Sequence, residues 1–117
     1  MAWEVEVSDE FRAWYQGLAL DLRASIAAGV DTLELLGPEA GRPLVDTLKG
    51  SKYPNLKELR IQHRGRPYRV LFILDVKRSV YLILGGDKSG NPHWYRDAIR
   101  RAERIYGEYL KEIGRGE

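Results

Sequence analysis

The sequence predicts an α+β fold with the element order βααβββα, in which an antiparallel sheet packs against helices. Three observations carry this prediction. Apolar residues recur at helical spacing over residues 9–36, strand-like segments follow one another over residues 56–85, and an amphipathic segment covers residues 94–113. The 117 residues suffice for one hydrophobic core and show no internal repeat, so a single domain over residues 1–117 is expected.

The first part of the chain is expected to form one strand and then two helices, or one interrupted helix. Apolar residues alternate with glutamates over residues 3–7, as in a half-buried strand, and Ser8 follows as an N-cap. Helical spacing then extends over residues 9–36, where Gly17 and Gly29 are the expected breaks. The strand therefore leads directly into the helical segment.

The middle of the chain is expected to contain a loop and a three-stranded meander. The Gly- and Pro-rich segment 37–55 predicts a crossing loop that holds one short helical turn at most. Three strands are expected next, at Leu56–His63, Tyr68–Leu74 and Ser79–Gly85. The segments between them have the length of hairpin turns, so the strands should pair antiparallel, with the N-terminal strand available to join the same sheet.

The last part of the chain combines a Gly-rich loop with a long helix. Residues 85–92 contain three glycines and a proline and are expected to form a loop. Apolar residues recur at helical spacing from Trp94 to Ile113, and the polar face between them carries several basic side chains. Disorder is expected only in the polar tail, residues 114–117.

The composition excludes several kinds of site. The chain has no cysteine, which excludes disulfides and thiolate chemistry, and with only His63 and His93 a structural zinc site is not expected. The loop at residues 85–92 lacks the spacing of a Walker loop, and no G-x-S-x-G elbow occurs. Asp87 and Asp97 are too isolated to suggest a two-metal nuclease. Neither a metal nor a cofactor is therefore expected.

The expected location is cytoplasmic, and the charge distribution hints at a polyanionic partner. No apolar stretch approaches the roughly 20 residues that span a bilayer, and the acidic start lacks the basic region of a signal peptide. Residues 1–41 contain two Lys/Arg against eight Asp/Glu, whereas residues 42–117 contain seventeen against nine. This asymmetry suggests a basic surface built by the second part of the chain, although charges that only solvate the surface would give the same count.

Four arginines lie close together on two expected strands and the turn between them. Side-chain alternation places Arg60, together with Glu58, on the exposed face of its strand, and Arg69 follows on the next strand. Arg64 and Arg66 lie on the turn, where solvated charges without function are the alternative. Because a guanidinium group stays charged and can hold a phosphate with two hydrogen bonds, the cluster could bind RNA and stabilise a phosphorane-like transition state.

The start of the last helix offers groups for proton transfer. His93 and Tyr95 can each exchange a proton, Lys88 in the preceding loop adds a cation, and Trp94 or Tyr95 can stack on an unpaired base. The alternatives are that Trp94 anchors the helix in the core and that His93 only caps it. If RNA is cleaved, the economical route is metal-free: a base activates the 2′-hydroxyl, cations steady the phosphate, and an acid protonates the leaving oxygen.

These residues together resemble the phage-derived, HigB-like branch of the RelE/ParE superfamily of toxins. The resemblance is carried by Leu56–Ile61, Tyr68–Phe72 and Leu82–Lys88, followed by the basic closing helix. It implies the βααβββα layout and, for many members, entry into the ribosomal A site and metal-free cleavage of mRNA. It further implies a cytoplasmic toxin of a type II toxin–antitoxin system that inhibits translation. The implied partners are the ribosome, mRNA and a cognate helix-turn-helix antitoxin that is HigA-like.

The resemblance also implies roles for individual residues. Arg60 matches a basic residue near the scissile phosphate, Arg69 matches the arginine that steadies it, and Lys88 occupies the basic position after the last strand. Tyr95 stands where RelE-type enzymes place a tyrosine that stacks on the message or assists proton transfer, and the match could shift to His93. The substrate-binding residues expected in addition are Lys57, Arg64, Arg66 and Arg96.

The general base is left open by the resemblance. Glu58 departs from RelE, which has a lysine near that place, so His93, Tyr95, Lys88 and Glu58 are all candidates. Two other functions also fit the pattern: a ParE-like gyrase inhibitor that shares the fold and cuts nothing, and a non-toxic RNA-binding accessory domain. The retained basic and aromatic residues favour the nuclease, and an adjacent antitoxin gene would distinguish a toxin from an accessory domain.

Overall fold

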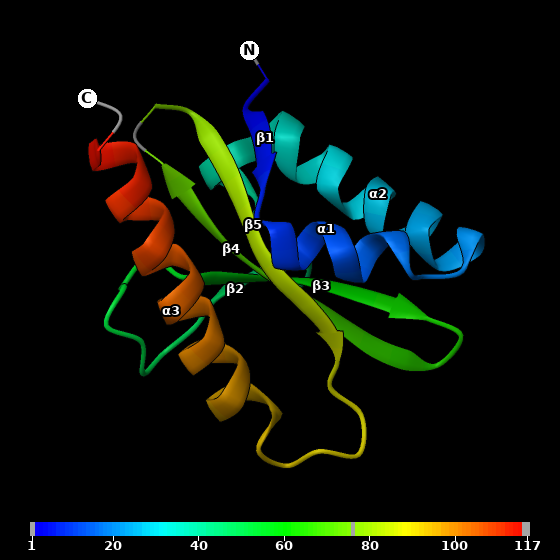
Figure 1. Ribbon diagram of the computed structural model, residues 1–117. Coiled ribbons are helices and arrows are strands. Elements are labelled where there is room, and N and C mark those ends of the chain that lie inside the picture. Colours follow the sequence, from blue (N-terminus) through cyan, green and yellow to red (C-terminus); the bar gives the residue numbers. More distant parts are fainter. Residues whose placement is uncertain (1, 76, 116–117) are drawn as a thin grey trace.

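A computed structural model describes residues 2–75 and 77–115 of the chain. The elements in chain order are β1 (Glu4–Val7), α1 (Asp9–Gln16), α2 (Leu20–Leu36), the 3-10 turn η1 (Gly37–Glu39), β2 (Val45–Thr47), β3 (Lys57–His63), β4 (Arg66–Asp75), β5 (Ser79–Asp87) and α3 (Trp94–Arg115). Figure 1 shows α1 and α2 on one face of a twisted sheet and α3 on the other. The predicted α+β class is confirmed.

The sheet has five strands in the order β1-β5-β4-β3-β2. The expected meander is present, because β4 pairs antiparallel with both β3 and β5. β1 joins the same sheet as expected, but it pairs with β5 in parallel, with Val5 opposite Val80. At the other edge β2 pairs antiparallel with β3. The sheet is thus mostly antiparallel, with one short strand more than the sequence predicts.

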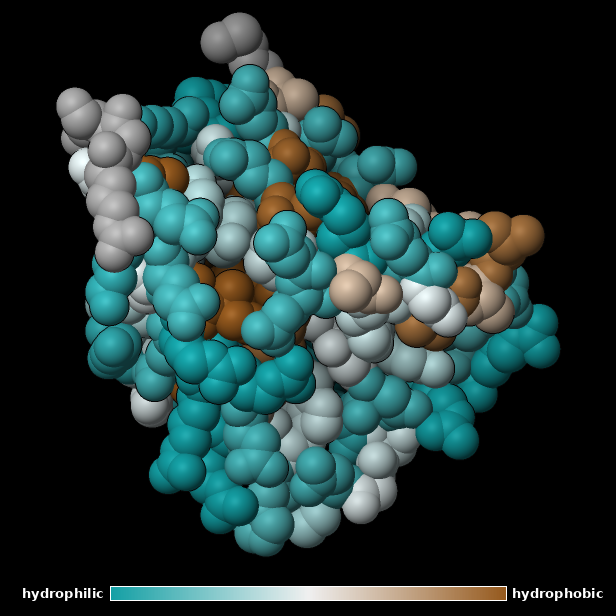
Figure 2. Space-filling model, viewed as in Figure 1, coloured by the Kyte–Doolittle hydropathy of each residue, from teal (hydrophilic) through white to brown (hydrophobic). Residues whose placement is uncertain are grey.

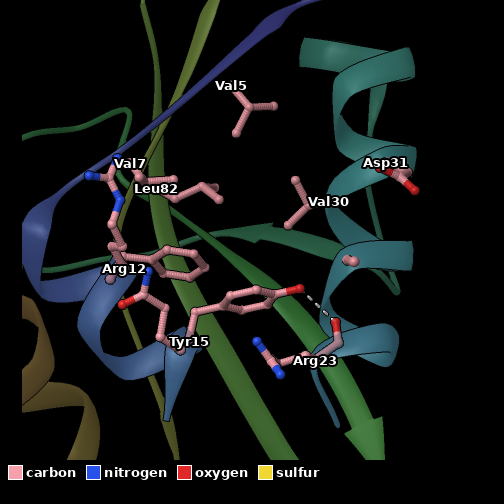
Figure 3. Close-up of a pocket in the computed structure, with 11 residues that line it drawn as sticks. Val5, Val7, Arg12, Tyr15, Arg23, Val30, Asp31 and Leu82 are labelled. Atoms are coloured by element: carbon pink, nitrogen blue, oxygen red, sulfur yellow. Dashed lines mark hydrogen bonds between the residues drawn. The ribbon is translucent and has the colours of Figure 1, made fainter. Parts of the chain in front are cut away.

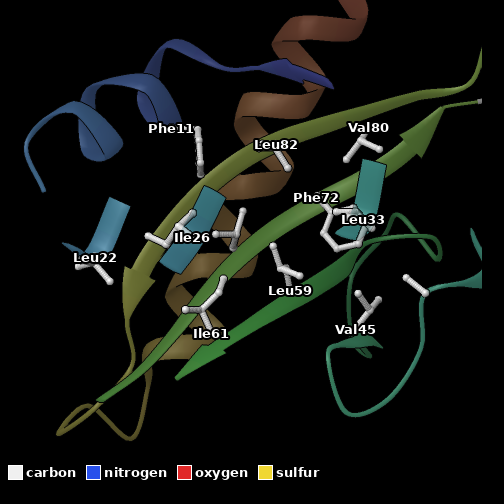
Figure 4. Packing of buried hydrophobic residues seen from close by; sticks show 12 residues of the cluster. Phe11, Leu22, Ile26, Leu33, Val45, Leu59, Ile61, Phe72, Val80 and Leu82 are labelled. Carbon is white, nitrogen blue, oxygen red and sulfur yellow. The ribbon is translucent and has the colours of Figure 1, made fainter. Parts of the chain in front are cut away.

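Both faces of the sheet are buried, each by its own helices. Alternate residues of β3, β4 and β5 point toward α1 and α2, and Figure 4 shows this cluster around Ile26, Leu59 and Phe72. The residues between them, such as Leu71 and Ile83, point toward α3. Period-two alternation with an apolar residue on both faces explains the long hydrophobic runs of β4 and β5.

The first two helices form as expected, except at one glycine. The Ser8 hydroxyl accepts a hydrogen bond from the Phe11 backbone N–H at 2.9 Å, which confirms the N-cap of α1. Gly17 ends α1, as expected. The expected break at Gly29 is wrong, because this residue lies inside α2. A methyl group there would lie 3.4 Å from Ile61, so glycine permits a close approach of α2 to β3.

The segment 37–55 is more ordered than expected. The expected short helical turn is present as η1, and the segment also contains β2, which the sequence analysis placed in a loop. Val45 of β2 is buried opposite Leu59. Gly37 has a φ of 56°, and a Cβ there would overlap the Trp3 ring, so only glycine fits this position.

The hairpin between β3 and β4 has a two-residue turn, Arg64–Gly65, and both residues have positive φ. This geometry is that of a type I′ turn, which matches the twist of antiparallel strands. The turn sets the register that places Arg60 directly opposite Arg69. In the turn between β4 and β5, Val76 lies outside the described residues.

Figure 2 shows a largely hydrophilic surface on one face of the molecule, with apolar residues gathered at the outer end of the α1–α2 hairpin. Of the tail expected to be disordered, Gly114 and Arg115 belong to α3, and residues 116–117 lie outside the described residues. Within the described residues no helix combines the length and the apolar character that a membrane span requires.

Candidate active site

The register of β3 and β4 brings the strongest candidates for chemistry together. Arg60 and Arg69 are direct cross-strand partners, and side-chain alternation puts Glu58 on the same face as Arg60. That face was expected to be exposed. It is instead covered in part by α3, because Tyr95 in the first turn of this helix reaches the strand residues.

Glu58 lies at the centre of this cluster and is 3% exposed. Its Oε1 atom accepts a hydrogen bond from the Tyr95 hydroxyl at 2.6 Å and lies 3.3 Å from Arg69 Nε. Its Oε2 atom accepts hydrogen bonds from Arg60 Nε and Nη2, both at 3.2 Å. A buried carboxylate requires such partners, since an unpaired buried charge is strongly unfavourable. The expectation that Glu58 lies on an exposed face is therefore wrong.

Tyr95 connects the buried carboxylate to the surface. Its hydroxyl donates to Glu58 and accepts from Arg69 Nε at 3.1 Å, and Lys88 Nζ lies 5.7 Å from the centre of its ring. Burial raises the pKa of Tyr95 above its usual value, and the hydrogen bond to Glu58 raises it further against the opposing effect of Arg69. Tyr95 is therefore a neutral phenol at physiological pH, and its hydroxyl proton is donated to Glu58.

The unpredicted strand β2 completes one side of the site. Asp46 Oδ2 lies 3.2 Å from Arg60 Nη2 and 2.9 Å from Arg42 Nη2. The hydrogen bond from Arg42 lowers the pKa of Asp46 and outweighs the effect of burial. A pocket of about 370 Å³ opens here. It is lined by Arg42, Asp46, Thr47, Leu48, Lys49, Glu58, Arg60, Tyr95 and Ile99.

Sequence reasoning missed Arg42, Lys49 and Asp46 as members of the site. The only local signal was an arginine and an aspartate four residues apart in a segment rich in Gly and Pro. Their place depends on the pairing of β2 with β3, which is a long-range contact.

The predicted substrate-binding residues are dispersed, and each already has a polar partner. Arg64 pairs with Asp21 at 2.7 Å, and Arg66 pairs with Asp87 at 2.7 Å. Lys57 donates to Thr47, and Arg96 lies beside Asp97. Arg64 and Arg66 are at least 63% exposed, so a phosphate could displace their present partners. Their role in substrate binding remains a prediction.

His93 lies outside the hydrogen-bonded cluster that Glu58 forms with Tyr95 and the two arginines. His93 is exposed, and its backbone N–H donates to the Asn91 side chain. Within residues 2–75 and 77–115, its ring makes no hydrogen bond or ion pair.

Gly85 and Gly86 belong to β5 and not to a loop. A Cβ at Gly85 would overlap the Trp14 ring, and one at Gly86 would lie 3.1 Å from Trp94, so these glycines make room for tryptophans.

An apolar pocket of about 440 Å³ lies on the opposite face, between α1, α2 and β1 (Figure 3). Its wall includes Val5, Val30 and Leu82, and across it the Tyr15 hydroxyl donates to the Arg23 carbonyl at 3.1 Å. The pocket contains a phenol, Tyr15, and a carboxylate, Asp31, but the Tyr15 hydroxyl donates to a backbone carbonyl and not to this carboxylate. Across the described residues, moreover, no group of three or more His, Asp or Glu is arranged to hold a metal ion.

Comparisons with known proteins identify the family of the chain. The family of phage-derived Gp49-like proteins (DUF891) matches residues 13–107. The candidate toxin HigB3 of Mycobacterium tuberculosis (strain ATCC 25618 / H37Rv) is 42% identical over 98 residues, which are 83% of this chain and 84% of HigB3. The candidate toxin HigB2 of the same organism is 35% identical over 115 residues, which are 97% of this chain but only 57% of HigB2.

Solved structures share the fold at low sequence identity. A variant of the E. coli toxin RelE in the free state is 18% identical, with a TM-score of 0.59 and coverage of 97% of this chain and 99% of that one. The chain matched in the intact E. coli RelBE toxin–antitoxin complex is 16% identical, with a TM-score of 0.56 and coverage of 73% and 95%. With its RelE-like fold and its HigB relatives, the chain belongs to the Gp49-like family of HigB-type toxins.

Proposed function

We propose that this protein is the toxin of a type II toxin–antitoxin pair and that it cleaves mRNA on the ribosome without a metal ion. One observation carries the proposal. Glu58, Tyr95, Arg60 and Arg69 form a single hydrogen-bonded cluster beside a pocket that also contains Arg42. The cluster combines a proton acceptor, a phenol and guanidinium groups, which are the groups that metal-free RNA cleavage needs.

In the proposed reaction the 2′-oxygen of the RNA attacks the adjacent phosphorus and the 5′-oxygen leaves. Glu58 and Tyr95 both line the pocket, but Glu58 is only 3% exposed and its Oε1 atom already accepts the hydrogen bond of the Tyr95 hydroxyl, so we assign the direct contact with the ribose to Tyr95. Tyr95 therefore takes the 2′-hydroxyl proton as it gives its own proton to Glu58. This concerted transfer avoids a free phenolate, which the raised pKa of Tyr95 would disfavour.

The cations stabilise the charge that develops on the phosphate. Arg60 lines the pocket and can donate directly to a phosphate there, whereas Arg69 lies beside the other oxygen of Glu58 and can donate to the phosphate once its side chain turns away from Glu58. Lys88, next to the Tyr95 ring, is suited to hold the backbone or to protonate the leaving 5′-oxygen. The products are a 2′,3′-cyclic phosphate and a 5′-hydroxyl end.

The proposed partners are the ribosome, mRNA and an antitoxin. The similarity to HigB-type toxins and to a chain of the RelBE toxin–antitoxin complex supports an antitoxin partner, for which a HigA-like helix-turn-helix protein is the first candidate. The cytoplasm, where ribosomes and mRNA are found, is the proposed location.

Induced expression with mapping of mRNA 5′ ends tests this function. We expect growth arrest and new 5′ ends within translated messages, and we expect both to disappear when the neighbouring gene is co-expressed. Arg12→Ala serves as a matched control, because Arg12 is exposed and lies on α1, outside the proposed site. Intact messages together with supercoiling defects would contradict the proposal and favour gyrase inhibition.

A further inference from the structure

A second polar pocket, of about 400 Å³, lies between the edge of the sheet and the C-terminal half of α3. Carboxylates from three elements line it, and no lysine or arginine is among its lining residues. They are Glu6 of β1, Asp9 and Glu10 of α1, and Glu108 and Glu112 of α3. Figure 2 shows a hollow between α3 and the start of α1 with an apolar floor and a hydrophilic rim. This pocket is acidic although the chain has a net charge of +2.

The floor of the pocket contains a largely buried tyrosine whose hydroxyl has no hydrogen-bond partner among the described residues. Tyr81 is 6% exposed, and its hydroxyl makes no hydrogen bond to any described residue. Burial first, and then the neighbouring Tyr109, Glu112, Asp9 and Glu6, raise the pKa of Tyr81 to about 12. The phenol thus faces the same carboxylates that line the pocket, as an unused hydrogen-bonding group.

Aromatic rings form one wall. The rings of Tyr81 and Tyr109 stack with their centres 4.0 Å apart, and the Tyr109 hydroxyl donates to Glu6 Oε1 at 3.4 Å. Aromatic rings and carboxylates around one cavity are the combination that attracts a cationic group, since ring faces and carboxylates both carry negative potential.

Most of the carboxylates in the pocket form no ion pair within the described part of the chain. Glu10 pairs with Arg101 at 2.9 Å and with Arg104 at 3.7 Å. The other four carboxylates, those of Glu6, Asp9, Glu108 and Glu112, make no ion pair with the described residues. The carboxylates without ion pairs and the Tyr81 hydroxyl without a hydrogen-bond partner are two independent features, and both indicate a ligand that carries positive charge and hydrogen-bond donors.

We propose that this acidic pocket binds an arginine side chain of the antitoxin. The identity of the partner rests on the proposed function, whereas the chemistry of the ligand rests on the pocket. RNA is excluded by the uncompensated carboxylates. A guanidinium group fits better than an ammonium group, because its planar fork can bond two carboxylates while its face lies against a tyrosine ring.

The pocket is separate from the proposed active site. Tyr95 and Tyr109 are 14 positions apart on α3, which corresponds to about 21 Å along the helix. Substitutions in the pocket should therefore leave RNA cleavage unchanged, and the two proposals can be tested independently.

The first experiment titrates the full chain with Nα-acetyl-arginine methylamide and follows the ring signals of Tyr81 and Tyr109 by NMR. We expect saturable shifts at these rings, and none with the uncharged citrulline analogue. Combined Glu6→Gln and Glu112→Gln substitutions should weaken binding about 10-fold, as expected for two exposed charges of about 0.7 kcal/mol each. Glu39→Gln, on the distant turn η1, is the matched control. Absent shifts, or equal affinity in the double variant, would overturn the proposal.

The second experiment uses the product of the neighbouring gene. The dissociation constant of the toxin–antitoxin complex should rise about 10-fold or more in the Glu6→Gln, Glu112→Gln variant, while growth arrest by the toxin alone is unchanged. Tyr81→Phe should also weaken the complex without loss of thermal stability, because it removes a hydroxyl that has no partner in the described structure. Equal affinities for wild type and both variants would refute the proposal that this pocket binds the antitoxin. Loss of growth arrest in the wild type would refute only the proposed function.

Discussion

Tyr95→Phe is the most direct test of the proposed proton transfer. The substitution keeps the ring over Lys88 but removes the hydroxyl between Glu58 and Arg69. Loss of a group that transfers a proton in the transition state should lower the single-turnover cleavage rate by roughly 100-fold or more. Tyr95→Ala should lose at least as much, since it also removes any stacking on the message, which is worth about 1–3 kcal/mol.

The same substitution should leave the protein folded. A hydrogen bond to a charged group contributes about 1.5–3 kcal/mol to stability, and Glu58 keeps both arginines as partners in the variant. Small domains have about 5–15 kcal/mol of stability, so even the lower value leaves about 2 kcal/mol, or roughly thirty folded molecules for each unfolded one. Unfolding would therefore lower the cleavage rate by only a few per cent, far less than the expected 100-fold.

Cleavage on programmed ribosomes, measured together with thermal unfolding, decides between the roles of Tyr95. Tyr53→Phe is a suitable control, because Tyr53 packs against Tyr106 on the distant half of α3. If Tyr95→Phe cleaves at the wild-type rate and only Tyr95→Ala fails, then the ring stacks on the message and the proton-transfer scheme is wrong. If Tyr95→Ala is stable and fully active, Tyr95 is not part of the site and His93 becomes the next candidate.

Three further outcomes are expected. Arg60→Ala and Arg69→Ala should each reduce cleavage by about two to three orders of magnitude. Arg69→Ala should also cost about 1–3 kcal/mol in urea unfolding, because Glu58 loses a buried partner; unchanged cleavage by both folded variants would exclude this phosphate site. Gly85→Ala should destabilise the fold by about 1–3 kcal/mol through overlap with a tryptophan, whereas Gly41→Ala, with open space around it, should be neutral. Because burial raises the pKa of Tyr81 to about 12, the folded protein holds the phenol proton more tightly than the unfolded chain, so stability should fall as the pH rises from 10 to 12; Tyr81→Phe should flatten this part of the alkaline unfolding curve without changing stability at neutral pH, and an unchanged curve would contradict that assignment.

Local patterns predicted most of the fold, because most elements are stabilised by contacts that follow a regular period. The apolar alternation in residues 3–7 and 56–85 and the helical spacing in 9–36 and 94–113 all correspond to observed elements. The errors occurred where tertiary contacts override local preference. Gly29 stays helical because α2 packs closely on β3.

The site was predicted less completely than the fold. Arg60, Arg69 and Tyr95 were proposed from residue type, position and the family resemblance, and the structure brings them together, although their roles stay predictions. The burial of Glu58 was not predictable, because it depends on how α3 crosses the far face of the sheet. Asp46 was missed for a similar reason, since the three-residue strand β2 exists through its pairing with β3.

The unequal charge of the two parts of the chain does not become two separate surfaces. The acidic pocket combines Glu6 from the first part with Glu112 from the second, and Arg64 of the second part pairs with Asp21 of the first. Strand register and helix placement decide which charges meet. The count along the sequence could therefore indicate a polyanion-binding function but could not locate its site.

The position of Glu58 between two arginines couples the proposed proton acceptor to the proposed phosphate site. In the free protein Arg60 Nη2 donates a hydrogen bond to one oxygen of the Glu58 carboxylate, and Arg69 Nε lies 3.3 Å from the other. A phosphate that enters the pocket competes for the same donors, because each guanidinium group has a limited number of N–H groups. The same two arginines thus hold Glu58 in place and supply the charge for the phosphate, so replacing either one should disturb the acceptor and the phosphate site together.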